Sequence, residues 1–243
     1  AFYADLGVSD FSVTFAPYLF RSWEDIEKLA ESDWWAEQEE KLRETTGLVI
    51  VGSNWHYGVR NTITKEPVQS PEDMKGLKIR VPGNQLQVDS MGALGAAGTP
   101  MSLGDVYTAL QQGTIDGVSG TTLTNMYGGK FYEQCDYITM TKHHFIPAPV
   151  VMNEDLWNSL SSEDQEIVQK AFNDSISYQR EQAASYVEKA VAEIEDSGTE
   201  IVEIDADEWA DAMHSTYDKW VGTKGIEQDM IDKIQESEKQ YLK

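Results

Sequence analysis

The sequence predicts an α/β protein on the basis of three observations. Short apolar runs alternate with helical segments over residues 48–122, a pattern typical of a sheet covered by helices. A stretch of roughly 35 residues, 162–196, lacks Pro and Gly and carries an apolar stripe, which predicts one helix of ~50 Å. That length exceeds the diameter of a small domain, so we expect two lobes joined by ordered strands and by this helix.

Capping residues, apolar periodicity and Gly or Pro breaks delimit the remaining elements. Ser22, for example, predicts an N-cap with Asp25 at the N3 position. The expected helices lie over residues 23–30, 33–45, 71–74, 85–94, 103–112, 154–159, 162–196, 206–221 and 226–241. The expected strands lie over residues 48–52, 62–64, 77–81, 115–118, 137–141, 148–152 and 200–204. Residues 1–20 are expected to be irregular.

Composition excludes several classes of function. The net charge is -23, with 42 acidic against 19 basic residues, so the chain repels nucleic acid and anionic membrane surfaces. No apolar run approaches the ~20 residues that cross a bilayer, so no membrane insertion is expected. The single cysteine, Cys135, excludes an internal disulfide and is expected to be a packing residue.

Several motifs suggest chemistry but are incomplete. The segment around Ser119 resembles a nucleophile elbow but lacks its last glycine, and the glycines of 92–98 end a helix instead of opening one. His143 and His144 are expected to be structural, because no acidic cluster nearby completes a metal site. The sequence therefore predicts no catalytic residues, metal or cofactor, although a carboxylate pair of the glycosidase kind stays open among the many acids.

Arg80 is the main candidate for ligand binding. It lies at the carboxyl end of the strand over 77–81, before Pro82 and Gly83, and ligands of open α/β sheets bind at such ends. A guanidinium group matches a carboxylate in bidentate geometry. On this pattern alone, a solvated arginine at a strand end is the commoner outcome.

Trp55 is the other residue that stands out. The remaining tryptophans fall at helical positions where core packing explains them. Trp55 instead lies in a corner between two strands with His56 and Tyr57, five residues before Arg60. It is therefore a candidate ligand contact.

Six segments in a fixed order resemble the solute-binding proteins of TRAP transporters, the C4-dicarboxylate-binding or DctP type. They are residues 74–82 with the motif Arg80-Val81-Pro82, then 98–101, 105–113, 115–117, 131–133 and 153–160. The resemblance covers essentially the whole chain. It implies a periplasmic-binding-protein-like fold in which two lobes, joined by hinge strands and a long helix, close on an organic acid.

The resemblance also implies the lobes and the binding residues. Lobe I is expected to comprise residues 1–57 and 147–180, lobe II residues 58–146 and 199–225, with the helix 162–196 spanning both and a C-terminal helix over 226–243. The arginine of the Arg-Val-Pro motif, Arg80, is the implied carboxylate anchor, and Arg60 is the implied second basic contact. The expected ligand-binding residues are Arg80, Arg60, Trp55, Tyr57, Asn84, Tyr107, Thr121, Thr122 and Asn125.

The sequence departs from the family pattern in three ways. The first ~80 residues of the family are absent, so lobe I is expected to be incomplete. Gly120 replaces the usual asparagine contact, leaving Thr121, Thr122 or Asn125 to compensate. Leu103 replaces an aromatic residue, and Gly83 a polar one. Because two contact positions are glycines, we expect room for a sugar acid, such as a hexuronate or aldonate, more than for a small dicarboxylate.

The expected function is that of an extracytoplasmic receptor, not an enzyme, that delivers an organic acid to the membrane subunits of a TRAP permease. The alternatives are a receptor for a C4-dicarboxylate or sialic acid and, more distantly, an enzyme acting on sugar acids. The expected location is periplasmic or extracellular, with a lipid anchor as an option for the full-length protein. The oligomeric state is left open.

Overall fold

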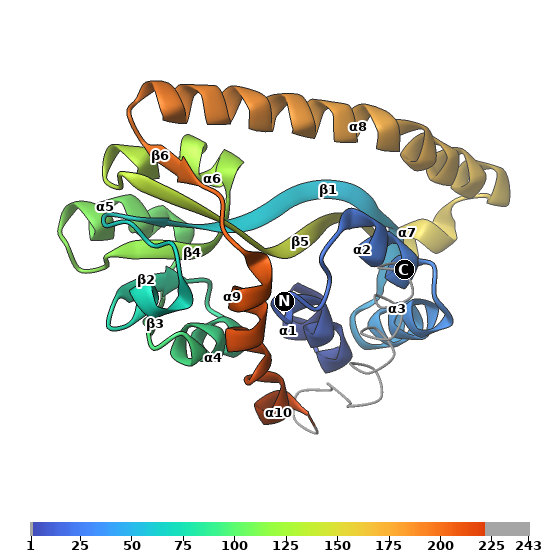
Figure 1. The fold of residues 1–243 in the computed structure, drawn as a ribbon. Coiled ribbons are helices and arrows are strands. Elements are labelled where there is room, and N and C mark those ends of the chain that lie inside the picture. The colour runs from blue at the N-terminus through green and yellow to red at the C-terminus, as the bar shows by residue number, and fades with distance from the viewer. Residues whose placement is uncertain (1, 222–243) are drawn as a thin grey trace, which may run out of the picture.

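The computed structural model describes residues 2–221, and within them the chain forms one six-stranded mixed sheet (Figure 1). The strand order is β3-β2-β4-β1-β5-β6. The strands are β1 (Leu48–Thr64), β2 (Lys78–Val81), β3 (Ala97–Pro100), β4 (Gly117–Thr122), β5 (Tyr137–Asn153) and β6 (Glu200–Val202). β2 pairs in parallel with β3 and β4, whereas β1 pairs antiparallel with β4 and β5. The α/β class is confirmed.

Helices cover this sheet. Among residues 2–221 the α-helices are α1 (Phe2–Asp5), α2 (Trp23–Ala30), α3 (Asp33–Thr46), α4 (Gln85–Ala93), α5 (Val106–Gln111), α6 (Leu123–Gly128), α7 (Glu154–Ser159), α8 (Ser162–Asp196), α9 (Ala206–His214) and α10 (Tyr217–Trp220). The 3-10 helices are η1 (Ser9–Phe15), η2 (Pro71–Met74), η3 (Leu103–Asp105) and η4 (Phe131–Glu133). Ser22 caps α2 as predicted, since its side chain accepts a hydrogen bond from the N–H of Asp25.

The two longest strands join two lobes. Figure 1 shows β1 and β5 running from the region of β2–β4 and α4–α6 to the region of α1–α3. Each region has its own buried clusters, one around Ile63 and Val118 and one around Phe11 and Trp35. The two-lobed architecture agrees with the expectation, while the lobe boundaries stay a prediction.

The prediction of separate strands along this connection is wrong. Residues 48–52 and 62–64 are the two ends of β1, and residues 137–141 and 148–152 both belong to β5. The register between β1 and β5 shifts at four places, for example between His56 and Gly58. Each β-bulge disturbs the alternation of side chains, so the sequence between the regular ends looks like a loop.

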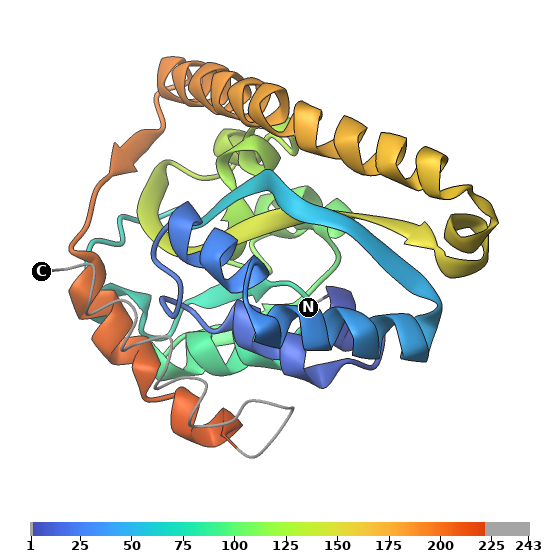
Figure 2. The ribbon, with the colours of Figure 1, turned by 90° about the vertical axis from the view of Figure 1, so that its right-hand side faces the viewer.

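The long helix α8 has the predicted bounds and runs along β1 (Figures 1 and 2). Phe172 anchors it, because its ring fills the space beside Gly52 of β1. The indole of Trp55 stacks on the same ring at a centroid distance of 5.7 Å. None of the described helices is long and apolar enough to span a bilayer.

The two ends of the chain differ from the prediction. Residues 1–20 contain α1 and η1 instead of irregular structure. The helix expected over 206–221 is divided into α9 and α10. Between them the hydroxyl of Thr216 donates to the carbonyl oxygen of Met213, so this carbonyl has a side-chain partner that competes with the backbone hydrogen bonds of a continuous helix. The helix expected over 226–241, or 226–243 as a unit, lies outside the described residues.

The space beside Gly52, which the ring of Phe172 fills, gives a prediction about stability. A Cβ atom at this position would lie 2.0 Å from Cε1 of Phe172, so we expect Gly52→Ala to displace the ring and to destabilise the protein by about 1–3 kcal/mol. The matched control is Gly92→Ala, because a Cβ at Gly92 of α4 meets nothing within 4 Å. Calorimetric melting should give a Tm several degrees lower for the first variant only. Equal Tm values for both variants would contradict the role of the contact between Gly52 and Phe172 in stability.

Candidate ligand-binding site

Arg80 is buried near the end of β2 and has a fixed guanidinium group. Only 4% of the residue is exposed, so the alternative of a solvated strand-end arginine is wrong. Its Nε and Nη2 both donate to the carbonyl oxygen of Met101, at 3.0 and 2.7 Å. Burial lowers the pKa of Arg80 to about 10, so the group remains charged at neutral pH.

Arg60, on β1, is held beside Arg80. Its guanidinium carbon lies 5.5 Å from the centroid of the Phe15 ring, and its Nη1 is buried without a hydrogen-bond partner among the described residues. The pKa of Arg60 is lowered to about 10, first by burial and then by the positive charge of Arg80. Both arginines line the same cavity, so the two charges are close.

Neither guanidinium forms an ion pair with a carboxylate within residues 2–221. Two like charges that are partly removed from water repel each other and lose hydration. An anionic ligand would supply the missing counter-charge and a partner for Nη1 of Arg60. The pair is therefore suited to bind a carboxylate or another compact anion.

The two arginines line a cavity of about 160 Å³ at the carboxyl ends of β2 and β4. Of the nine predicted ligand-binding residues, the structure brings six together in its wall, including both arginines. The lining residues are Tyr57, Arg60, Arg80, Pro82, Leu103, Gly120, Thr121, Thr122, Asn125 and Ile146. The hydroxyl oxygen of Thr121 is also buried without a partner in the described chain. We call this cavity the arginine pocket.

The other three predicted residues lie outside the arginine pocket and have structural partners. Trp55 donates through Nε1 to Oγ of Ser175 on α8, at 3.0 Å. Asn84 caps α4, where its Oδ1 accepts a hydrogen bond from the N–H of Leu86. The structure therefore does not bring Trp55 or Asn84 to the two arginines.

Tyr107 is the third of these residues. Its hydroxyl donates to Oε2 of Glu133 at 2.8 Å and accepts a hydrogen bond from Nε2 of Gln134 at 3.1 Å. These contacts link α5 to η4 and leave the phenol outside the walls of the arginine pocket.

The two glycines expected to leave room for the ligand differ. Gly120 has φ of +71°, and a Cβ there would lie 3.1 Å from side-chain atoms of Pro82 and Gln87, so the expected free space is filled. Gly120 serves the backbone conformation of β4 instead. A Cβ at Gly83 meets nothing within 4 Å, so only this position offers open space.

A larger cavity of about 880 Å³ lies next to the arginine pocket, beneath α8. Tyr57, Thr122 and Asn125 line both cavities. The amide nitrogen of Asn125 donates to the hydroxyl of Tyr57 at 3.2 Å, so this pair stands where the cavities meet. The arginine pocket alone is smaller than the ~300–1,000 Å³ of ordinary small-molecule sites, and the adjoining space brings the total into this range.

Sequence reasoning missed Phe15, which lies against Arg60 although it precedes it by 45 residues. The prediction that His143 and His144 are structural agrees with their burial. Nδ1 of His143 lies 2.8 Å from the hydroxyl of Thr141, and Nε2 of His144 contacts the carbonyl oxygen of Phe15. Burial, reinforced by the charge of Arg60, lowers the pKa of His143 to about 3 and that of His144 well below its usual value.

Comparison with known proteins identifies the family to which a chain of this fold belongs. Residues 2–223 match the family described as bacterial extracellular solute-binding protein, family 7. The C4-dicarboxylate-binding periplasmic protein DctP of Rhodobacter capsulatus is 30% identical over 93% of this chain and 68% of its own length. The chain therefore spans about two thirds of that relative.

Solved structures give the same result. A TRAP periplasmic solute-binding protein of Fusobacterium nucleatum, with bound sn-glycerol-3-phosphate, is 30% identical, with a TM-score of 0.85 over 98% of this chain and 76% of its own. One of Pseudomonas putida F1, with bound D-glucuronate, is also 30% identical, with a TM-score of 0.81 over 94% and 73%. The chain belongs to the family 7 extracellular solute-binding proteins. Members of this family are the substrate-binding proteins of TRAP transporters and are not enzymes.

The buried histidines give a prediction about pH. In the unfolded chain they gain protons as the pH falls below ~6.5, while folded His143 stays neutral down to about 3. Stability should therefore fall with pH in this window, by about 1.4 kcal/mol per unit for each histidine. Urea unfolding at pH 7 and pH 5 should show a loss that is smaller in His143→Asn by about 2 kcal/mol. The same loss in both proteins would mean that His143 is protonated in the fold.

Proposed function

We propose that this chain is the ligand-binding part of an extracytoplasmic receptor that holds an organic acid by its carboxylate at Arg80 and Arg60. The observation that carries the proposal is the pair of charged, partly desolvated guanidinium groups with no carboxylate partner in the described chain. The orphaned Nη1 of Arg60 and hydroxyl of Thr121 supply further hydrogen bonds to the anion. The liganded receptor would then deliver the acid to TRAP permease subunits.

A sugar acid is the ligand class that the pocket chemistry favours. Beside the two arginines stand hydroxyl and amide groups of Thr121, Thr122 and Asn125, which match the hydroxyl groups of a hexuronate or aldonate. The exposed ring of Tyr57 provides an apolar face for a sugar ring. The solved relatives of Pseudomonas putida and others hold D-glucuronate, β-D-galacturonate and L-fuconate, which supports the same class.

Other anions are the alternatives. Relatives named for C4-dicarboxylate and sialic acid binding are similar in sequence, and the relative from Fusobacterium holds a phosphate ester. Succinate, a small dicarboxylate, offers no hydroxyl groups to the side chains of Thr121, Thr122 and Asn125, so it would form fewer hydrogen bonds in the arginine pocket than a sugar acid. Titration calorimetry with D-glucuronate, L-galactonate, succinate, sialic acid and sn-glycerol-3-phosphate distinguishes them, and tightest binding of succinate would contradict the sugar-acid class.

Closure of the two lobes over the ligand is part of the proposal. We infer that β1 and β5 act as the hinge, because they run between the lobes and their register shifts at several bulges. Trp55, Asn84 and Tyr107 are not assigned to the ligand, since each of them has a structural partner.

The arginine pair gives the main test. We expect Arg80→Ala to weaken binding of the best acid in the calorimetric panel by about 2–5 kcal/mol, roughly 30-fold or more, because a desolvated carboxylate loses its charged partner. Arg80→Lys should also bind weakly, since an ammonium group lacks the planar fork.

The control is Arg43→Ala, because Arg43 lies on α3 and pairs with Glu40 at the surface. This variant should bind like the wild type. An affinity of Arg80→Ala equal to that of Arg43→Ala would remove Arg80 from the site.

A further inference from the structure

One edge of β1 is bonded by a helix instead of a strand. β4 pairs with β1 only at Arg60 and beyond, so the preceding part of this edge has no strand partner among residues 2–221. Side chains of α8 take that place. Nε2 of Gln169 donates to the carbonyl oxygen of Val51 at 2.9 Å, and Nε and Nη2 of Arg180 donate to that of Asn54 at 3.2 and 3.0 Å.

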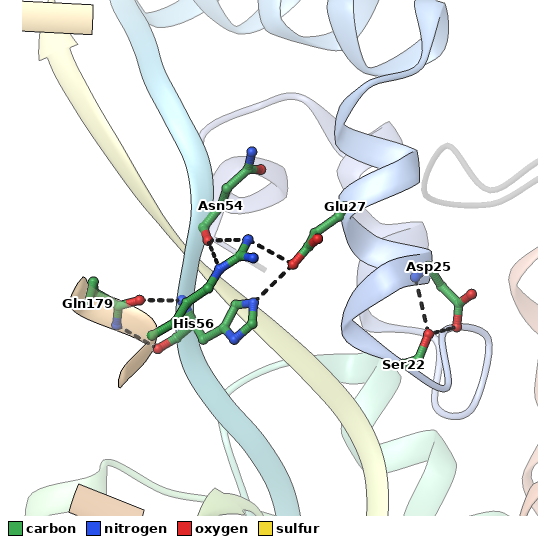
Figure 3. Close-up of polar contacts among 7 residues, drawn as sticks. Ser22, Asp25, Glu27, Asn54, His56 and Gln179 are labelled. Carbon is green, nitrogen blue, oxygen red and sulfur yellow. Dashed lines mark hydrogen bonds and ion pairs between the residues drawn. The ribbon is translucent and has the colours of Figure 1, made fainter. Parts of the chain in front are cut away.

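Gln179 makes the most complete of these contacts (Figure 3). Its Oε1 accepts a hydrogen bond from the backbone N–H of His56 at 2.9 Å, and its Nε2 donates to the carbonyl oxygen of His56 at 2.9 Å. One side-chain amide thus reproduces both hydrogen bonds that a neighbouring strand residue would make. The backbone of β1 is fixed to α8 at this residue.

Glu27 of α2 joins the same place from the other lobe region. Its Oε1 accepts from Nη2 of Arg180 at 2.7 Å and lies 3.1 Å from Nε2 of His56 (Figure 3). The imidazole of His56 also stacks on Trp23 of α2, with ring centroids 3.6 Å apart and planes 5° from parallel. Three elements, α2, β1 and α8, therefore meet at one half-buried carboxylate, and we call these contacts the β1 clamp.

The β1 clamp ends where the arginine pocket begins. Tyr57 follows His56 directly, and Arg60 comes four residues later. Between them the register with β5 shifts, and Gly58 has φ of +148°. From Gly58 to Arg60 the strand pairs in regular register with β5, but the bulge between His56 and Gly58 separates this stretch from the ladder before it. The contacts at His56 therefore fix the strand where the paired stretch that carries Arg60 begins.

We propose that Gln179 and Arg180, together with Glu27, are positioning residues for the ligand site. They fix β1 at His56 and Asn54, so that Arg60 stays beside Arg80 although the two charges repel. Their importance for an anionic ligand rests on the proposed function, whereas the clamping of β1 does not. Gln179 and Arg180 line the adjoining larger cavity but not the arginine pocket, so their effect on Arg60 passes through the backbone of β1.

The test compares two glutamines of α8. Gln179 and Gln169 both bond the backbone of β1 through their amides, at His56 and at Val51. In ligand-free protein, we expect Gln179→Ala to raise amide hydrogen exchange over residues 55–61 at least 10-fold. Gln169→Ala should leave these residues unchanged and affect only those near Val51.

Ligand binding gives the second readout. With the acid of the panel that the wild type binds best, Gln179→Ala and Glu27→Gln should weaken binding by about 5-fold or more, and Gln169→Ala by less than 2-fold. A merely structural role would lower the Tm of the two glutamine variants alike without this difference in affinity.

Two outcomes overturn the proposal. One is an unchanged exchange rate over residues 55–61 in Gln179→Ala, and the other is an equal increase in both glutamine variants. If the wild type binds no acid, the proposed function fails while the exchange data still decide whether the β1 clamp exists.

Discussion

The central constraint in this molecule is the repulsion between two guanidinium groups. Burial lowers the pKa of both Arg60 and Arg80, and the positive charge of Arg80 lowers that of Arg60 further. Within the described chain no carboxylate relieves them, which is unusual for a protein with 42 acidic residues. A fold that keeps such a pair together favours the binding of anions, because the ligand supplies the negative charge that no side chain of the described residues provides.

The sheet explains how the pair is held. β4 lies between β2 and β1, with Arg80 opposite Val118 on one side and Arg60 opposite Thr122 on the other. These two partners are four residues apart, or ~13 Å along a strand, yet both long side chains reach the wall of one cavity from the two sides of β4. β2 and β4 run parallel and end at the same edge, which is where a ligand of an open sheet binds.

The two arginine side chains are held in place by different contacts. Arg80 is bound to a neighbouring backbone carbonyl, whereas Arg60 lies on a long, bulged strand and rests against Phe15. The contacts of α8 and α2 near His56 restrain that strand from outside the sheet. The same strand runs between the lobes, so the proposed closure of the lobes would act on the strand that carries Arg60.

The sequence allowed the fold class, the exact extent of α8 and the place of Arg80 near the end of a strand to be predicted, because local patterns carry them. A long stretch without Pro and Gly indicates a helix, and an apolar-basic alternation before a Pro-Gly break indicates the end of a strand. The role of Arg80 as the anchor stays a prediction. The sequence did not reveal that β1 is continuous, since its bulges hide the alternation of side chains. It also misplaced Trp55, whose partner Ser175 is 120 residues away and leaves no local trace.

Ligand space was equally hard to predict from residue types. Gly120 suggests a vacant position, yet Pro82 and Gln87 occupy the space, and only the folded chain brings them there. Long-range contacts of this kind decide the shape of a pocket, whereas its charge can be inferred from the sequence.

The most direct test of the arginine pair is the crystal structure of the protein with the organic acid that it binds best. The account predicts that the carboxylate oxygens lie within ~3 Å of nitrogen atoms of both Arg80 and Arg60. An acid bound elsewhere, with both guanidinium groups facing water, would contradict it.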